Sequence, residues 1–253
     1  MIQQKVLDNG YVALIEHWGS DERIVEAARM STGKGFLGWG TSHSENCLMG
    51  VMPPVDKPPC DCGATVGDEK LLAYLYNNKH MTPFEMAGMT IEVKAPIFVF
   101  REWHRHRTQS YNEMSARYVP LPDENYVPSI ERLMLGANTA TTNKQAQGTG
   151  GLSFENAECF RRQLIASYNR AQAVYELGLQ AGVPKELARL PVPVARYSRM
   201  RASANLRNWL GFLTLRDHPA AQWEIRQYAG AVANLVCENF PQTYKLYLGD
   251  KNG

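Results

Sequence analysis

A run of cationic and hydroxyl-bearing residues between positions 101 and 118, REWHRHRTQSYNEMSARY, is the part of this sequence best equipped for chemistry. Its polar members include Arg105, His106, Arg107, Ser110, Asn112, Glu113, Ser115 and Arg117. Arginine forks suit phosphate and carboxylate oxygens, while Ser, Asn and Glu side chains bind hydroxyls and ring amides. A solvated charged face or an internal ion-pair network is the alternative. The apolar run APIFVF leads into the stretch from a buried element, which favours a site for a polar, anionic ligand.

A second group of polar residues lies in the C-terminal half, where Arg189, Asn205, Arg207 and Arg216 stand in otherwise apolar sequence. If residues 204–216 form one helix, Asn205 and Arg216 are about three turns apart and share a face. Arg216 then lies at the helix C-terminus, where the helix dipole favours a cation. A simple helix-end charge is the usual interpretation of an isolated Arg. The accumulation of four such residues favours a binding site instead.

Several common catalytic patterns are absent from the sequence. It contains no G-x-G-x-x-G after a predicted strand, no Walker A loop and no G-x-S-x-G elbow. No cysteine has the cationic neighbours of a convincing nucleophile, although Cys159 is followed closely by two arginines. His43, Cys47, Cys60 and Cys62 are possible zinc ligands, but the single-residue gap between the last two is tighter than the usual spacing. We therefore predict no metal site and no catalytic thiol.

Hydrophobic patterns predict the elements that must position the first group. Residues 5–16 are typical of a hairpin around Asn9-Gly10, a pair that type I′ turns prefer. Residues 89–94 alternate between apolar and polar, as in a half-buried strand. Ala95-Pro96 then opens an apolar helix, IFVFREWHRHR, that is expected to carry the start of the central stretch, residues 101–118.

The longest predicted helix begins after its cap at Ser153 and continues to about Ala181. A stripe along it that includes Phe154, Tyr168 and Tyr175 is expected to be core. Gly182 is expected to end this helix. An extended segment, PVPVARYSRMR, should follow, and a further helix should begin near residue 203.

The composition indicates a soluble globular protein of 253 residues with a net charge of +2. This near-neutral charge argues against nucleic-acid or membrane-surface binding, and no apolar run approaches the ~20 residues of a membrane span. The N-terminus lacks the features of a signal peptide, and five scattered cysteines fit reduced thiols, so a cytoplasmic location is expected. We predict one domain over residues 1–253, with surface insertions near 33–66 and 136–151.

Residues 105–117 match the pattern R-H-R-x-x-S-x-N-E-x-S-x-R at every defined position, and this stretch resembles the flavin-dependent thymidylate synthases of the ThyX type. The resemblance extends upstream through HxTPFE at 80–85 and KAPIFVFRxW, and downstream through ELAR, NxR and LRxxxxAQWEI. It covers most of the chain outside 33–66 and 136–151. Enzymes of this type make dTMP from dUMP with the methylene of methylenetetrahydrofolate and with FAD reduced by NADPH. They are homotetramers whose flavin sites are assembled from several subunits.

Two sets of ligand-binding residues are implied by this resemblance, carried over by motif position. FAD would be bound by Ser31, His80, Thr82, Glu85, Arg105, His106, Arg107, Glu113, Asn205 and Arg207. The dUMP would be held by Glu102, Arg105, Glu113, Ser115, Ala116, Arg117, Arg189 and Arg216. Arg216 is the catalytic candidate, as the group that activates the pyrimidine ring.

The residue types agree with this chemistry. C5 of uracil must become a nucleophile, and this chain offers no cysteine to add to C6, so activation must be electrostatic or come from hydride delivery. Arg216 stays protonated and is interpreted as a stabiliser of negative charge rather than a base. Arg117 and Arg189 suit the phosphate. Two positions depart from relatives: Glu102 stands where many carry Gln, and Gly211 removes a side-chain contact to flavin.

The implied fold is α+β, a mixed or antiparallel sheet packed by long helices, in a single domain that tetramerises. Two other classes of function stay open beside the synthase. One is a dUMP-stimulated NADPH/flavin oxidoreductase that no longer methylates. The other is a nucleotide- or RNA-binding protein, which predicts no flavin and a steep salt dependence of nucleic-acid affinity. The near-neutral charge disfavours this last class.

Overall fold

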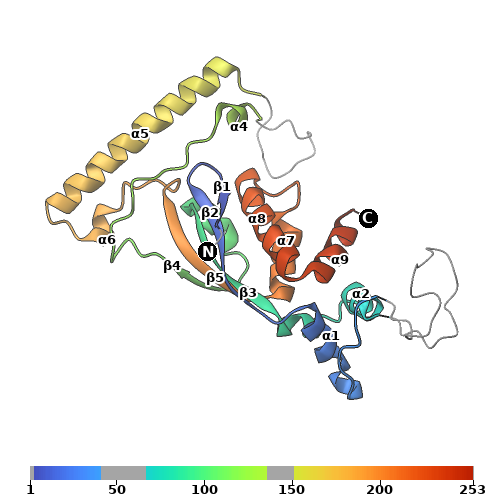
Figure 1. The fold of residues 1–253 in the computed structure, drawn as a ribbon. Coiled ribbons are helices and arrows are strands. Elements are labelled where there is room, and N and C mark those ends of the chain that lie inside the picture. The colour runs from blue at the N-terminus through green and yellow to red at the C-terminus, as the bar shows by residue number, and fades with distance from the viewer. Residues whose placement is uncertain (1–2, 41–66, 136–150, 253) are drawn as a thin grey trace. The chain divides into compact units, whose positions relative to one another are not determined.

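The protein has an α+β fold, as predicted, and its strands form one sheet (Figure 1). The computed structural model describes residues 3–40, 67–135 and 151–252. Within these ranges the sheet has five strands in the order β1-β2-β3-β5-β4, and the pairs β1–β2 and β4–β5 are antiparallel. The strands are β1 (Gln3–Val6), β2 (Gly10–Trp18), β3 (Gly88–Pro96), β4 (Ser110–Glu113) and β5 (Tyr197–Asn205).

Helices connect and follow these strands. Those in the described ranges, with η for a 3-10 helix, are α1 (Asp21–Arg29), η1 (Met30–Thr32), α2 (Glu69–Asn77), η3 (Thr82–Met86), α3 (Ile97–Trp103), α4 (Ile130–Met134), α5 (Phe154–Gln180), α6 (Lys185–Ala188), α7 (Leu206–Arg216), α8 (Trp223–Asn239) and α9 (Pro241–Asn252). None of these helices is long and apolar enough to cross a membrane. The last helix, α9, was not predicted from the sequence.

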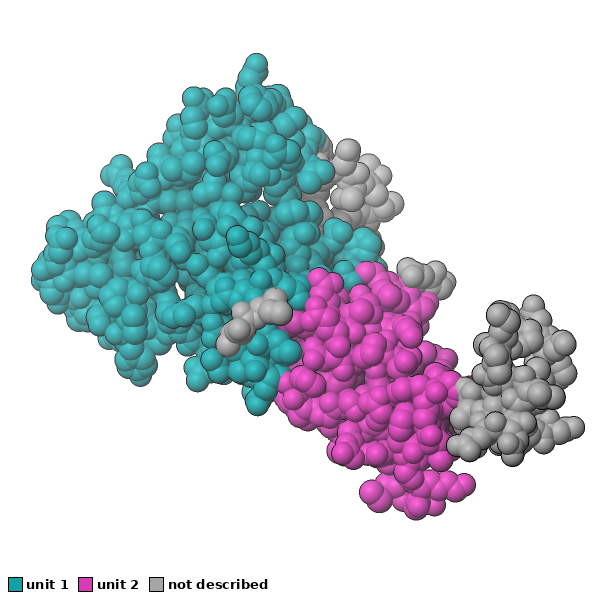
Figure 2. Space-filling view, in the orientation of Figure 1, with its two compact units in different colours: residues 1–16, 90–204, 211–232 teal, residues 17–89, 205–210, 233–253 magenta. Residues whose placement is uncertain are grey.

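The chain divides into two compact units, coloured separately in Figure 2. Unit 1 consists of residues 1–16, 90–204 and 211–232. Unit 2 consists of residues 17–89, 205–210 and 233–253. The candidate substrate residues all fall in unit 1, so this unit is described first.

The predicted hairpin is present as β1 and β2, but its turn differs from the prediction. Val6 pairs with Gly10, so residues 7–9 make the turn and Gly10 is already part of β2. Leu7 takes the left-handed conformation, with φ 57°. A Cβ on Gly10 would lie 2.0 Å from the hydroxyl oxygen of Tyr228. Glycine is therefore needed at position 10 for close packing rather than for a type I′ turn.

Strand β3 leads directly into α3, the element that delivers the central stretch. Pro96 is the N-cap residue, and Val99, Phe100 and Trp103 are buried. The ring of Trp103 packs 4.5 Å, centroid to centroid, from that of Phe212. The helix ends at Trp103, so the prediction that it continues through the Arg-His-Arg run is wrong. That run lies in a turn between α3 and β4.

The second half of the central stretch forms β4, an edge strand of the sheet. It pairs with β5 in a register that sets Ser110 opposite Ser203 and Glu113 opposite Met200. One further bond, from Met114 N–H to the carbonyl of Arg199 at 2.8 Å, extends this pairing past the end of β4. The second half of the stretch is therefore a short edge strand, which ends beside Met200 of β5.

Helix α5 begins and ends where the sequence predicts. Ser153 accepts a hydrogen bond from the backbone N–H of Asn156, and Gly182 follows the helix with φ 78°. Tyr175 and Ala157 are buried in unit 1. Phe154 is 58 % exposed, so the prediction that the whole stripe is core is wrong at this position. Three other apolar side chains of α5 are also exposed: Phe160, Val174 and Leu177.

Unit 2 has its own core, built from residues such as Ile24, Leu72, Phe84 and Phe240. Within it, Leu206 N–H donates to the carbonyl of Ala87 at 2.7 Å, which fixes the start of α7. Asn205 is the last residue of β5, and its side-chain oxygen accepts from Asn208 N–H at 3.0 Å. It therefore caps α7 and is not part of that helix. The premise that Asn205 and Arg216 share a helix face is wrong.

Candidate functional site

A cavity of about 340 Å³ in unit 1 lies beside the end of β4. Four of the predicted dUMP residues line it: Glu113, Ser115, Ala116 and Arg189. The remaining lining residues are Ile97, Met114, Leu121, Val192 and Ser198. Cavities that bind small molecules typically begin at about 300 Å³ and combine apolar walls with a few polar groups. The cavity therefore has the size and the residue types of a small-molecule site.

The β4–β5 pairing and a tight turn shape one wall of the cavity. Tyr118 N–H donates to the carbonyl of Ser115 at 3.0 Å, and Arg117 N–H donates to its hydroxyl oxygen at 3.3 Å. This turn presents Ser115 and Ala116 to the cavity. Ile97, the first residue of α3, also lines the cavity. Its N–H donates to the carbonyl of Arg196 at 2.9 Å, which holds the start of α3 against the chain just before β5.

The two predicted phosphate-binding arginines, Arg117 and Arg189, have different surroundings next to helix α6. Arg189 is the C-cap residue of α6 and lines the cavity. Arg117 instead pairs with Glu186 of α6, with 3.2 Å between its Nε and the carboxylate. Lys185 donates to the carbonyl of Tyr118 at 2.9 Å, so α6 is tied to the Ser115 turn. Only Arg189 of this pair belongs to the cavity lining.

Arg216, the predicted catalytic residue, is held by three hydrogen bonds within unit 1. Its Nη1 donates to the Glu102 carboxylate at 2.9 Å and its Nη2 to the Glu102 carbonyl at 2.8 Å. Its Nε donates to Nε2 of His106, also at 2.9 Å. A guanidinium has five N–H groups, so these bonds leave one N–H on each terminal nitrogen for another acceptor. The arrangement orients a mostly buried cation.

His106 can accept this bond because it is neutral. Burial, with the positive charge of Arg216 as a second cause, lowers the pKa of His106 to about 4. The imidazole also packs edge-on against Phe212, with ring centroids 4.9 Å apart. Its ring therefore contributes a lone pair to Arg216 rather than a competing charge.

This neutral histidine predicts a particular loss of stability in acid. The folded chain protonates His106 near pH 4 and the unfolded chain near 6.5, so the unfolded state binds more protons between these values. The stabilisation is complete above pH 6.5 and is lost as the pH falls towards 4. We expect His106→Gln, which does not titrate, to show a shallower fall of Tm from pH 7 to 4.5 than the unmodified protein. Thermal unfolding by circular dichroism measures both slopes, and equal slopes would contradict the assignment.

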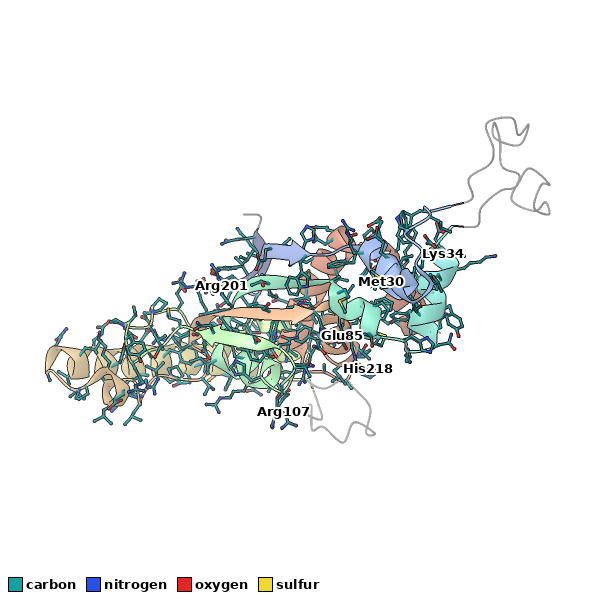
Figure 3. The ribbon with its side chains drawn as sticks, turned by 90° about the horizontal axis from the view of Figure 1, so that it is seen from below. Met30, Lys34, Glu85, Arg107, Arg201 and His218 are labelled. Carbon is teal, nitrogen blue, oxygen red and sulfur yellow. The ribbon has the colours of Figure 1, made fainter. Side chains whose placement is uncertain are left out.

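The turn that carries Arg105 and Arg107 is fixed by Tyr111. The Tyr111 hydroxyl contacts the carbonyls of His106 at 2.7 Å and of Trp103 at 3.1 Å. Burial raises the pKa of Tyr111 to about 12, so the phenol keeps its proton and can donate. The side chains of Arg105 and Arg107 are exposed, and Arg107 is labelled in Figure 3. The structure therefore fixes the backbone of this turn while its arginines face solvent.

Six of the ten predicted FAD residues belong to unit 2: Ser31, His80, Thr82, Glu85, Asn205 and Arg207. Arg207 and Glu85 form an ion pair at 2.5 Å. Ser31 and Thr82 are exposed, as is His80, whose ring packs edge-on against Tyr74. The other four, Arg105, His106, Arg107 and Glu113, belong to unit 1. Of these, Glu113 lines the cavity.

The other positions considered in the sequence are Gly211, the possible metal ligands and Cys159. A Cβ on Gly211 would meet no described atom within 4 Å apart from its chain neighbours and the backbone of its own helix, so the described structure leaves room for a side chain there. The described residues contain no group of three metal-ligating side chains. His43, Cys47, Cys60 and Cys62 lie outside the described ranges. Cys159 is an exposed thiol.

Sequence reasoning missed two polar residues of this region, Tyr111 and Ser198. Tyr111 occupies an undefined position of the motif, so its anchoring role was not readable there. Ser198 lies on the same face of β5 as the buried residues Met200 and Ala202. A serine on the apolar face of a strand is a signal that could have identified it. The apolar residues Leu121 and Val192 gave no such signal.

Comparison with known proteins places these features in a family. Residues 13–242 match the family model described as "Thymidylate synthase complementing protein". A flavin-dependent thymidylate synthase of Thermus thermophilus is 37 % identical over 242 residues, covering 96 % of this chain and 77 % of the relative. One from Thermosipho africanus is 34 % identical over 250 residues, covering 98 % of this chain and 94 % of the relative.

A solved structure is also similar over nearly the whole chain. It is the UMP/dUMP methylase PolB from Streptomyces cacaoi bound with 5-Br UMP, with a TM-score of 0.76 and 28 % identity, covering 97 % of this chain and 96 % of the other. The same protein bound with 5-Br dUMP gives a TM-score of 0.75. The motif, the fold and these matches agree. The chain belongs to the family of flavin-dependent thymidylate synthases.

Proposed function

We propose that this enzyme converts dUMP to dTMP, with methylenetetrahydrofolate as carbon donor and with FAD reduced by NADPH. The observation that carries the proposal is the cavity in unit 1, whose polar lining includes Glu113, Ser115 and Arg189. The printed names of the relatives, thymidylate synthases and a UMP/dUMP methylase, agree with a pyrimidine nucleotide as substrate.

We propose that the phosphate of dUMP binds in this cavity. Arg189 supplies a guanidinium and Ser115 a hydroxyl, the groups that suit phosphate oxygens. Glu113 accepts hydrogen bonds from a sugar hydroxyl or a ring N–H. Arg216 then stabilises negative charge that develops on the pyrimidine ring, with the two N–H groups that Glu102 and His106 do not use. No cysteine nucleophile is required.

The residues present fit a flavin dinucleotide. No ion pair holds Arg105 or Arg107 within the described ranges, so both guanidiniums can face a diphosphate. His80, Thr82 and Arg207 add exposed polar groups. These residues, with Ser31, Glu85, His106, Glu113 and Asn205, would hold FAD, which supplies hydride after reduction. We further propose a single catalytic domain that assembles as a homotetramer.

Flavin retention and nucleotide turnover test this proposal together. The protein is purified, incubated with FAD, gel-filtered and examined by its visible spectrum, then mixed with NADPH, methylenetetrahydrofolate and either dUMP or UMP. We expect retained flavin that NADPH bleaches faster with dUMP, and dTMP as the product. Oxidation of NADPH that dUMP stimulates, without dTMP, would identify the oxidoreductase instead. Absence of retained flavin would leave only nucleotide binding.

A further inference from the structure

We propose that Ser198 is a substrate-positioning residue whose hydroxyl donates a hydrogen bond to the phosphate of the bound nucleotide. This inference rests on the proposed function, because it takes dUMP as the occupant of the cavity. Ser198 is not part of the Arg105–Arg117 motif. The argument for it comes from its burial, its place in the sheet and the chemistry of its neighbours.

Ser198 is a buried polar group without a partner. Its residue is 2 % exposed, and its hydroxyl oxygen has no hydrogen-bond partner within the part of the chain that the structure describes. Nearly all buried polar groups in folded proteins are hydrogen-bonded, because an unpaired one loses the bonds it had with water. Since Ser198 lines the cavity, the cavity's ligand is the partner that its position offers.

The β4–β5 pairing brings this residue towards a predicted phosphate ligand. The pairing runs to Glu113 opposite Met200, and the bond from Met114 N–H to the Arg199 carbonyl lies one residue further along. Ser115 follows Met114 and Ser198 precedes Arg199, so the chain carries both serines to the same end of this pairing. Both line the cavity.

The neighbouring charges favour the phosphate over other parts of the nucleotide. Arg189, a cation, lines the same cavity as the two serines. A cation with two hydroxyl groups is a set suited to a phosphate dianion, because hydrogen bonds to a charged acceptor are the stronger ones. Glu113 also lines the cavity and repels that charge, so it fits the sugar end of the ligand.

A second cavity, of about 450 Å³, shares Ser198 and Met114 with the first. Its polar lining contains Lys94 and Glu124, which form an ion pair at 2.5 Å, and also Arg199, which forms no ion pair among the described residues. Both cavities therefore offer a cation. The first also contains Glu113, Ser115 and Arg189, three of the residues that the resemblance assigns to dUMP. On this ground we assign the Ser198 hydroxyl to the first cavity.

The test compares Ser198→Ala with Ser203→Ala, a matched substitution on the same strand. Ser203 lies opposite Ser110, and its hydroxyl contacts that of Thr90 at 3.0 Å. Binding of dUMP and of deoxyuridine, which lacks the phosphate, is measured by calorimetry on the flavin-loaded enzyme, with Tm recorded for each free protein. We expect Ser198→Ala to weaken dUMP binding about tenfold or more and to leave deoxyuridine binding unchanged. Ser203→Ala should bind dUMP as the unmodified enzyme does, and Ser198→Thr, which keeps the hydroxyl, should restore most of the affinity.

The free-protein Tm separates this role from a structural one. Removing an unpaired buried hydroxyl should leave the Tm of Ser198→Ala unchanged or raise it. A fall of several degrees would overturn the inference, because it would show that the hydroxyl has a partner in the folded chain. Equal dUMP affinity in Ser198→Ala and the unmodified enzyme would also overturn it, as would equal weakening of dUMP and deoxyuridine. Failure of the unmodified enzyme to bind dUMP would overturn the proposed function and this inference with it.

Discussion

Arg216→Ala is expected to lower the rate of dTMP formation by a factor of about 10²–10³ while the enzyme keeps its flavin. The two N–H groups of Arg216 that Glu102 and His106 do not use are the donors proposed to stabilise charge on the pyrimidine. Their loss acts on the transition state more than on the bound substrate, so kcat should fall while the dUMP affinity changes little. Single-turnover dTMP formation and flavin absorbance after gel filtration measure the two effects.

Two further variants sharpen this experiment. Arg216→Lys keeps the charge but cannot reproduce a forked set of three bonds, so its rate should stay well below that of the unmodified enzyme. Glu102→Gln keeps an acceptor for Arg216 while removing the countercharge, and it should retain turnover. Loss of flavin from Arg216→Ala, with activity restored by added FAD, would overturn the catalytic role. So would a Lys variant of full activity.

Arg189→Met is expected to raise the KM for dUMP by about 10- to 100-fold, with kcat nearly unchanged. Arg189 lines the cavity, and the loss of a charge-assisted bond to the phosphate weakens substrate and transition state alike. Arg117→Met is the matched control, because Arg117 pairs with Glu186 at the surface and does not line the cavity. An exposed ion pair contributes little to stability, and Arg117 lies outside the cavity lining. The KM of Arg117→Met for dUMP should therefore change less than that of Arg189→Met. Initial rates at varied dUMP decide between them, and equal effects would contradict the difference in role.

The sequence predicted much of the fold through local signals. Alternation identified β3, and the cap at Ser153 together with Gly182 identified the limits of α5. Local signals failed where a distant residue decides the conformation. Gly10 has the type of a turn residue, but Tyr228, over two hundred positions later, requires a glycine there for packing.

The end of α3 shows a similar limit at shorter range. The helical pattern runs on through the Arg-His-Arg segment, but the carbonyls of Trp103 and His106 both contact the hydroxyl of Tyr111. The chain therefore turns after Trp103. Asn205 is a different case: Asn is a preferred capping residue, so its type indicated a helix start, but the prediction placed it inside the helix.

The roles of the candidate site residues stay predictions. Three of the residues that the resemblance assigns to dUMP, Glu113, Ser115 and Arg189, line one cavity. The sequence gives no sign that Arg117 pairs with Glu186, because this ion pair depends on how α6 packs. Ser198 was not predicted because it lies outside the motif, although a serine on the apolar face of a strand indicates a buried hydroxyl.

The exposed apolar side chains of helix α5 should affect how fast its amide hydrogens exchange in solution. Its exposed apolar side chains, such as Phe160 and Leu177, leave one side of a long helix with little to hold it in a single chain. Helices with few packed contacts open locally and exchange their amide hydrogens early. If the proposed tetramer covers this face, deuterium uptake along α5 will slow as protein concentration rises. Exchange rates in this helix then report the fraction of assembled enzyme.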